Sequence, residues 1–194
     1  GRKGRDGDGH AGRAHGVLVS QPKEPRPVKL VASIFSPRKE LIGEALRLMS
    51  EKFGPTDYLS RFIPFDYTDY YREEMGGPLI RRFASFEALI DPSFLPEIKL
   101  FTNGIEDRFA SVGKRGVNID PGYLSEFHLV LATGKGYAHR PYLRDGIYAD
   151  LTLIYRDKDF RPLEWTYPDY GSKETIDILA KVRRKYVFQL KERR

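Results

Sequence analysis

The stretch Val-Lys-Leu-Val-Ala-Ser-Ile-Phe, residues 28–35, decides the fold, because it is the first segment of continuous β-branched and apolar character. Such a run is typical of a central strand that is covered on both faces. Ser36 and Pro37 follow directly, and a capping residue with a proline in the first turn predicts the start of a helix. Apolar residues then recur at helical spacing until Gly54 and Pro55 end the helix. This part of the chain therefore predicts a strand followed by a helix.

The rest of the chain continues with strands and helices. A strand is expected over residues 57–65 and another over 80–90, and a second helix begins at Asp91 and Pro92. The final third is mostly strand, and it ends in a helix that Ser172 caps. The strands expected there cover residues 117–120, 126–133, 146–155 and 160–164, with a break at Pro121-Gly122. We therefore predict an α+β fold: a ferredoxin-like split βαβ core with a largely antiparallel sheet, an added β-hairpin and a C-terminal helix.

The charge of the chain is unevenly distributed. The 194 residues carry a formal net charge of +6, but seven basic and three acidic residues lie within residues 1–29 alone. The glycine- and proline-rich segment 1–27 has almost nothing to bury, so we interpret it as a disordered basic tail. Residues 28–194 are expected to form a single domain. Since most of the excess charge lies in the tail, the domain lacks the concentrated positive charge of a strong nucleic-acid binder.

Several kinds of site are excluded by what the sequence does not contain. There is no cysteine, which rules out disulfides, cysteine–zinc sites and a thiol nucleophile. Neither Gly113-Lys114 nor Gly134-Lys135 is followed by the Ser or Thr that a P-loop requires. No apolar run is long enough to span a bilayer, and no segment has the pattern of a signal peptide. We therefore expect a cytoplasmic protein without a membrane partner.

A polar and tyrosine-rich segment follows the strand expected at residues 57–65. Asp66, Thr68 and Tyr70 are candidate ligand-binding residues, because aromatic rings beside carboxylates suit a base or a sugar. The alternative is a strand end whose tyrosines pack while their hydroxyls stay in water.

A second polar segment contains Asn118, Asp120 and Tyr123. In an extended strand Asn118 and Asp120 share one face, where their oxygens suit a sugar or a Mg²⁺ ion. Asp-Pro-Gly is also ordinary turn chemistry, which explains Asp120 without a function.

A third segment is a basic connection that contains several glycines. Lys135 and Arg140 suit a phosphate or a carboxylate, and His139 suits proton transfer. Tyr148 follows on the next expected strand and completes the candidate ligand-binding set. A solvated basic hairpin tip is the alternative interpretation. If the protein catalyses a reaction, His139 and Asp120 are the candidate catalytic residues.

Six ordered blocks of this sequence resemble one protein family. They are residues 28–30 (VKL), 64–71 (PFDYTDYY), 99–103 (KLFTN), 117–124 (VNIDPGYL), 139–148 (HRPYLRDGIY) and 165–170 (WTYPDY). The family is a functionally uncharacterised bacterial single-domain family, a domain of unknown function, and the resemblance covers residues 28 to 190. Some of its members are labelled GTP-binding proteins, which implies nucleotide binding. This chain has neither a P-loop nor an N-K-x-D guanine signature, so such binding requires another geometry.

The leading hypothesis is a domain that binds, and in one version acts on, a phosphorylated small molecule or nucleotide. Lys135 and Arg140 would hold phosphate, Asn118 and Asp120 a sugar or Mg²⁺, and the tyrosines after Asp66 would stack on a base. A non-catalytic RNA-binding module helped by the basic tail is one alternative. A protein-assembly domain that uses the C-terminal helix is another. The sequence leaves the occurrence of catalysis and the oligomeric state open.

Overall fold

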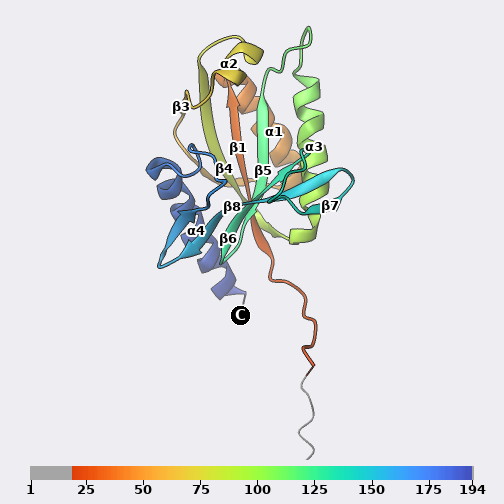
Figure 1. Cartoon of the computed structure of the whole chain (residues 1–194), viewed down its shortest axis with the longest axis vertical. Coiled ribbons are helices and arrows are strands. Elements are labelled where there is room, and N and C mark those ends of the chain that lie inside the picture. Colours follow the sequence, from red (N-terminus) through yellow and green to blue (C-terminus); the bar gives the residue numbers. More distant parts are fainter. Residues whose placement is uncertain (1–18, 194) are drawn as a thin grey trace, which may run out of the picture.

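The segment expected to decide the fold is the central strand β1 (Val28–Ser36), and all nine of its residues are buried. The computed structural model, which describes residues 19–193, places β1 between β4 (Leu79–Ile90) and β5 (Asn118–Leu124) (Figure 1). Both neighbours run antiparallel to β1. The apolar run is continuous because both faces of this strand are covered, as expected.

The first part of the chain forms the ferredoxin-like core. The chain between β1 and β5 forms α1 (Lys39–Phe53), β2 (Thr56–Leu59), β3 (Ile63–Phe65), a short helix described below, β4 and α3 (Leu95–Arg108). The short 3₁₀ helix η1 (Pro92–Phe94) directly precedes α3. The strand order is β2-β4-β1-β5, with every neighbouring pair antiparallel. The strand expected at 57–65 is divided into β2 and β3, and both pair with β4. The predicted split βαβ core is confirmed.

Four more strands widen the sheet beyond β5. They are β6 (His128–Thr133), β7 (Tyr142–Arg144), β8 (Ile147–Arg156) and β9 (Asp159–Pro162). β6 pairs with β5 and β8 pairs with β6, while β7 and β9 both pair with β8. The last helix, α4 (Lys173–Glu192), begins at Ser172, whose hydroxyl accepts a hydrogen bond from the Thr175 amide. The added hairpin and the C-terminal helix are therefore present, within a nine-stranded sheet.

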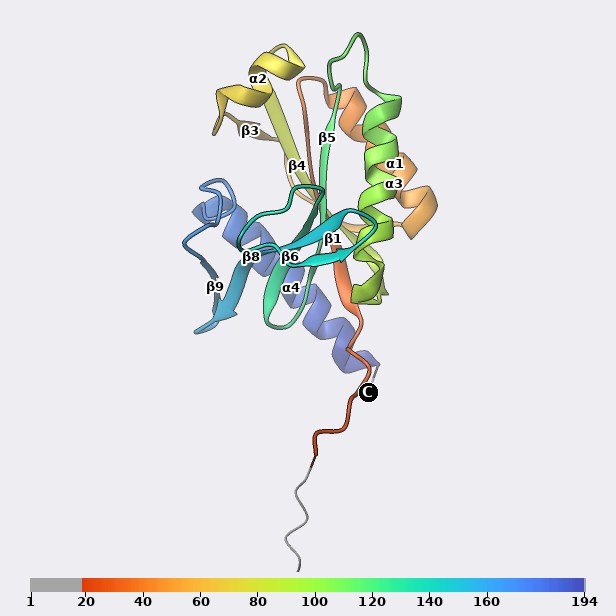
Figure 2. The ribbon, with the colours of Figure 1, turned by 45° about the vertical axis from the view of Figure 1, so that its right-hand side comes forward.

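Helices cover both faces of the sheet, as the two ribbon views show (Figures 1 and 2). On one face, α1 and α3 enclose a core cluster that includes Ile34, Met49 and Ile105. On the other face, α4 packs against a second cluster that includes Val31 and Leu153. Consecutive residues of β1 thus point into different cores, which explains why the strand is mostly apolar and why even its polar residues, Lys29, Ser33 and Ser36, are buried.

A short helix that the sequence analysis did not predict follows β3. This helix, α2 (Asp69–Met75), begins at Thr68, whose hydroxyl accepts a hydrogen bond from the Tyr70 amide. It ends at Gly76, which adopts a left-handed conformation with φ of 81°. α2 packs against Phe35, on the same side of β1 as α4. The tyrosine-rich segment is therefore a capped helix rather than a strand end.

Two local predictions are wrong. Pro121 and Gly122 do not break the strand, because β5 runs through both and pairs continuously with β1. A Cβ on Gly122 would lie 2.4 Å from the carbonyl oxygen of Val130, so the glycine lets β5 and β6 approach closely. The first helix begins at Lys39, and Ser36 instead donates a hydrogen bond from its hydroxyl to the backbone ahead of β5.

The lead-in before β1 is extended and has no regular secondary structure. Of the disordered tail predicted over residues 1–27, the first 18 lie outside the described residues. Near the end of the lead-in, Arg26 forms an ion pair with Glu126 (2.9 Å). In the described part of the chain, no helix combines the length and the apolar character needed to cross a membrane.

Candidate functional site

Polar and aromatic side chains from distant parts of the chain gather on the sheet face that α2 and α4 flank. Directly paired residues of antiparallel strands point to the same face, and Ser33 of β1 pairs with Asp120 of β5. One step along the sheet, Gly122 pairs with Leu131 of β6, which pairs with Asp150 of β8. Ser33, Asp120 and Asp150 therefore share this face. We call it the polar-aromatic face, and its side chains are Ser33, Tyr71, Glu74, Arg81, Arg115, Asn118, Asp120, Lys135, His139, Arg140, Tyr148, Asp150, Trp165, Tyr167 and Tyr170.

An ion-pair network ties α2 to β5. Arg115 donates two hydrogen bonds to Glu74, from Nε to Oε1 (2.7 Å) and from Nη2 to Oε2 (2.8 Å). Its Nη1 donates to Oδ1 of Asn118 (2.7 Å), whose Nδ2 donates to Oδ2 of Asp120 (2.9 Å). The bidentate bond to Arg115 lowers the pKa of Glu74, and the positive charge of Lys135 lies close enough to contribute. Asn118 thus positions Asp120, and Lys135 lies near the network.

Two tyrosines lie near the Asp120 carboxylate. Burial together with the negative charge of Asp120 raises the pKa of Tyr71 to about 12, and Tyr167 lies close enough to add to the shift. The Tyr71 ring packs edge-on against Phe35, with 4.9 Å between ring centroids. Tyr167 is 61% exposed. The Tyr71 ring is therefore held in place by packing, whereas the Tyr167 ring is open to solvent and to a ligand.

The connection between β6 and β8 contributes a cation and an imidazole. Nε of Arg140 donates to Oδ2 of Asp150 (2.7 Å), and its Nη1 donates to the Lys135 carbonyl (3.1 Å). Burial acts to lower the pKa of Arg140, but the bond and charge of Asp150 together with the Tyr167 hydroxyl outweigh it, and the pKa is raised. Nε2 of His139 lies 3.4 Å from the same Asp150 oxygen, and its ring stacks on Trp165 with 5.0 Å between centroids. Asp150 therefore holds both side chains in place.

Three buried polar atoms on this face have no hydrogen-bond partner in the part of the chain that the structure describes. They are the hydroxyl oxygens of Ser33 and Tyr170, which lie near each other but outside normal hydrogen-bond distance, and the Nε of Arg81. Burial and the charge of Asp120 raise the pKa of Tyr170, so its hydroxyl stays protonated at neutral pH. Arg81 is ion-paired with Asp169 and lies among four aromatic rings. An unpaired buried polar group costs about 1–3 kcal/mol, which a ligand supplying the missing partner would recover.

Most of the predicted site residues lie on this face. They are Asn118, Asp120, Lys135, His139, Arg140 and Tyr148. Tyr148 pairs with Thr133 beside Asp150, and its ring lies edge-on to that of Tyr142 at 5.3 Å. The expectation that Asn118 and Asp120 point together is confirmed by their hydrogen bond.

The other predicted residues do not join the face. Thr68 caps α2, and Asp66 and Tyr70 are exposed beside it. Tyr123 lies on the opposite side of the sheet, where it packs against the cluster around Val130. The strand alternation that brings Asn118 and Asp120 together necessarily turns Tyr123 away from them.

Sequence reasoning missed the residues that complete the face. Tyr71 and Glu74 are three positions apart on α2, so the capping signals at Thr68 and Gly76 could have placed them side by side. Arg115 and the polar atoms on β1 and β4 carry no local pattern that separates them from other surface or core positions. Only the sheet register reveals them.

The donor atoms of Asn118 and Asp120 do not fit a Mg²⁺ ion. The amide oxygen of Asn118 accepts a hydrogen bond from the Arg115 guanidinium, and its amide nitrogen faces Asp120. A hard cation requires free oxygen ligands and would lie beside that positive charge. Within residues 19–193, no group of three or more histidine or acidic side chains is arranged to hold a metal ion. The sugar-binding interpretation of Asp120 is the one that agrees with this geometry.

Comparison with known proteins identifies one family. Residues 26–186 match a family model described as a domain of unknown function, DUF4416. Comparison with curated proteins gives no match, and comparison with solved structures gives none. The matched segment contains every residue of the polar-aromatic face.

Proposed function

This chain belongs to the DUF4416 family, and since that family is a domain of unknown function, we propose from the site alone that the polar-aromatic face binds a small phosphorylated molecule of the nucleotide class. The observation that carries the proposal is the gathering of basic, acidic and aromatic side chains from four distant segments onto one face of the sheet. Binding takes place without a P-loop. A cytoplasmic location, where such ligands are abundant, forms part of the proposal.

The basic side chains suit the phosphate. Lys135 is exposed and forms no ion pair with another residue in 19–193, so its charge is available to an anion. Arg140 uses two of its five N–H donors on Asp150 and the Lys135 carbonyl, and the Tyr167 hydroxyl lies close to the guanidinium as well. A phosphate oxygen would bind to a donor that these groups leave free. Asp150 fixes the direction of the guanidinium before the ligand arrives, which reduces the entropy lost on binding.

The aromatic and acidic side chains suit the rest of a nucleotide. Trp165 is 40% exposed and Tyr167 61% exposed, so each offers ring surface for stacking against a base. Asp120 is half-buried and oriented by Asn118, which suits the acceptance of a sugar hydroxyl. The hydroxyls of Ser33 and Tyr170 lie beneath, and a polar ligand atom reaching them would supply their missing partner. His139 and Asp120 remain the candidate acid and base if a reaction follows binding.

Thermal unfolding of the full chain against a ligand panel tests this proposal. The panel comprises ATP, GTP, ribose 5-phosphate and inorganic phosphate, each beside its unphosphorylated counterpart where one exists. A ligand at 100 times its dissociation constant stabilises by about 2.7 kcal/mol, a shift of several degrees. Lys135→Gln should weaken binding by about tenfold or more because it removes a charge-assisted contact. Lys114→Gln, which changes another exposed loop lysine, is the matched control and should bind as the unmodified chain does. A panel without any shift would contradict the proposal.

RNA binding is the second candidate, and the exposed tyrosines around the face favour it. Tyr67, Tyr70 and Tyr137 are 50%, 62% and 70% exposed, which is unusual surface for side chains of this size. Bases of single-stranded RNA stack on such rings. This candidate predicts binding of a short single-stranded RNA that weakens steeply between 50 and 200 mM salt. Retention of binding at high salt, or no binding at low salt, would argue against it. A stable dimer at nanomolar concentration with no ligand and no RNA bound would instead favour protein assembly.

A further inference from the structure

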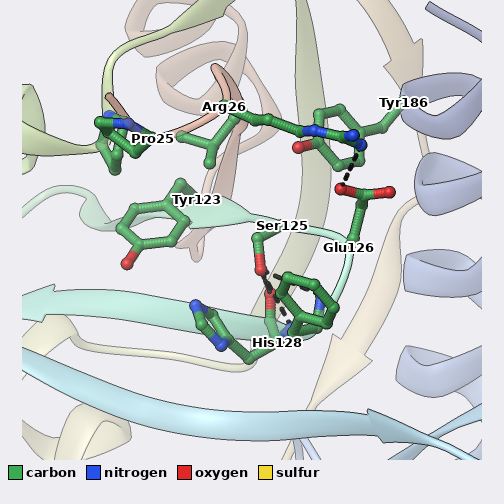
Figure 3. Close-up of a pocket in the computed structure, with 10 residues that line it drawn as sticks. Pro25, Arg26, Tyr123, Ser125, Glu126, His128 and Tyr186 are labelled. Carbon is green, nitrogen blue, oxygen red and sulfur yellow. Dashed lines mark hydrogen bonds and ion pairs between the residues drawn. The ribbon is translucent and has the colours of Figure 1, made fainter. Parts of the chain in front are cut away.

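A separate cavity lies at the other end of β1, away from the polar-aromatic face. Its volume is about 680 Å³, within the range of pockets that hold small organic molecules. The lead-in segment forms one wall through Pro25 (Figure 3). Val28, the first residue of β1, also lines the cavity. The turn between β5 and β6 forms another wall through Phe127, and Pro92 of η1 lines the cavity as well. Pro25, Val28, Pro92 and Phe127 are the apolar part of the lining.

The cavity is held in shape by contacts at its rim. Arg26 and Glu126 form an ion pair of 2.9 Å across the lead-in and the β5–β6 turn, so their charges balance each other. The hydroxyl of Tyr186 donates to the Pro27 carbonyl (2.9 Å), which fixes the lead-in against α4. The Ser125 hydroxyl accepts hydrogen bonds from two backbone amides of the turn. The charged and hydroxyl groups at the rim are therefore bonded to other protein groups, and the lead-in is held in position as one side of the cavity.

Two polar side chains in the cavity are not used by these contacts. Figure 3 shows the rings of Tyr123 and His128 next to each other, and their centroids are 6.0 Å apart. The hydrogen bonds among the lining residues involve only the Arg26–Glu126 pair and the Ser125 turn, which leaves the Tyr123 hydroxyl and the His128 ring nitrogens available. Burial lowers the pKa of His128 and raises that of Tyr123, so both are uncharged at neutral pH.

We propose that this cavity binds an uncharged, planar heteroaromatic molecule whose edge carries a hydrogen-bond donor and an acceptor, held by Tyr123 and His128. A neutral imidazole offers one donor and one acceptor, and the tyrosine hydroxyl offers both. Pro25, Val28 and Phe127 supply apolar surface for the faces of the ring. A charged ligand is disfavoured because the only charged side chains lining the cavity, Arg26 and Glu126, are already paired. The site is independent of the function proposed for the polar-aromatic face.

Protein-observed NMR of the full chain tests this inference. The probes are adenine, hypoxanthine and benzamide, each a planar aromatic molecule with a hydrogen-bond donor and an acceptor, and benzoate is the charged counterpart of benzamide. At least one uncharged probe should give saturable amide shifts at Val28, Ser125 and Phe127, while benzoate gives none. Tyr123→Phe removes only the hydroxyl and should weaken the bound probe about five- to tenfold. Tyr58→Phe, at a half-buried tyrosine on β2, is the matched control and should leave the affinity unchanged.

Three results would overturn the inference. One is the absence of saturable shifts at these amides with every uncharged probe. Another is benzoate binding as tightly as benzamide, since the cavity would then not discriminate against a charged ring. The last is unchanged affinity in Tyr123→Phe, provided that its thermal midpoint matches that of the unmodified chain. In the first case, shifts confined to residues near Trp165 would place the probe at the polar-aromatic face instead of in this cavity.

Discussion

Replacing Tyr170 by Phe should stabilise the protein and weaken its ligand binding at the same time. The Tyr170 hydroxyl is buried and has no partner within normal hydrogen-bond distance among residues 19–193, the closest candidate being the equally unpaired Ser33 hydroxyl, and the side chain is 5% exposed. An unpaired buried polar group costs about 1–3 kcal/mol, and phenylalanine keeps the ring while removing that group. The ring contact with Phe83, at 6.1 Å between centroids, remains. Tyr170→Phe should therefore gain about 1 kcal/mol or more.

A second tyrosine provides the control. Tyr186 is also buried, but its hydroxyl donates to the Pro27 carbonyl at 2.9 Å. Tyr186→Phe should lose about 0.5–1.5 kcal/mol, the net value of one hydrogen bond. Urea unfolding with equal slopes, followed by thermal melting, measures both variants. For a domain of this size each 1 kcal/mol corresponds to a shift of about 2–4 °C, so the two variants should move in opposite directions.

The same two variants separate a ligand-binding hydroxyl from a structural one. If Tyr170→Phe loses as much stability as Tyr186→Phe, then the Tyr170 hydroxyl has a partner in solution, such as an ordered water, and its role is structural. That result would refute the interpretation of Ser33 and Tyr170 as groups that await a ligand. A gain in stability with unchanged ligand binding would refute it equally, because the ligand would then not reach the hydroxyl.

Three further predictions follow from contacts elsewhere in the fold. Asp57→Asn should cost about 3 kcal/mol by urea unfolding, because it leaves Lys29 buried without its partner. Burial acts to raise the pKa of Asp57, but the hydrogen bonds from Lys29 and Ser85 and the nearby positive charges together outweigh it, so the pKa is lowered. The unmodified chain should therefore lose stability as pH falls from about 4 through that lowered pKa, and Asp57→Asn should lack this loss. Equal acid profiles would contradict this prediction. Gly122→Ala should cost about 1–3 kcal/mol through the 2.4 Å clash of its Cβ with a β6 carbonyl, whereas Gly134→Ala, with nothing within 4 Å, should cost far less. Thr68→Ala should cost about 1 kcal/mol and speed amide exchange within α2; unchanged exchange would show that the cap is dispensable.

The core of the fold was predictable because its signals are local. The apolar run of β1, the helical spacing that follows it and the cap at Ser172 each identify an element without reference to the rest of the chain. Strand order followed from the sequence of elements, since few connections are compatible with a split βαβ unit. The error at Pro121-Gly122 has the opposite origin. Pro121-Gly122 has the composition of a turn, but it stays extended because β5 pairs with β1 on one side and with β6 on the other. Gly122 lets the β6 backbone come close to β5.

The candidate site was predictable only in part, and for a physical reason. Asn118 and Asp120 share a face through strand alternation, which a sequence shows directly. Arg115, Glu74 and Tyr170 join them through sheet register and helix placement, which depend on pairings between segments far apart in the chain. Strand alternation also turns Tyr123 to the far side of the sheet, and this was missed because the strand was expected to break at Pro121-Gly122.

The most direct test of the central claim uses the single tryptophan of the chain, Trp165, which stacks on His139 within the polar-aromatic face. Its emission should change saturably when the full chain is titrated with the phosphorylated compound that shifts the thermal midpoint. The unphosphorylated counterpart should produce a much weaker response, and Lys135→Gln should move the titration to about tenfold higher concentration. If the thermal midpoint shifts while Trp165 emission does not change, the ligand binds elsewhere. If neither changes with any member of the panel, the polar-aromatic face does not bind phosphorylated small molecules.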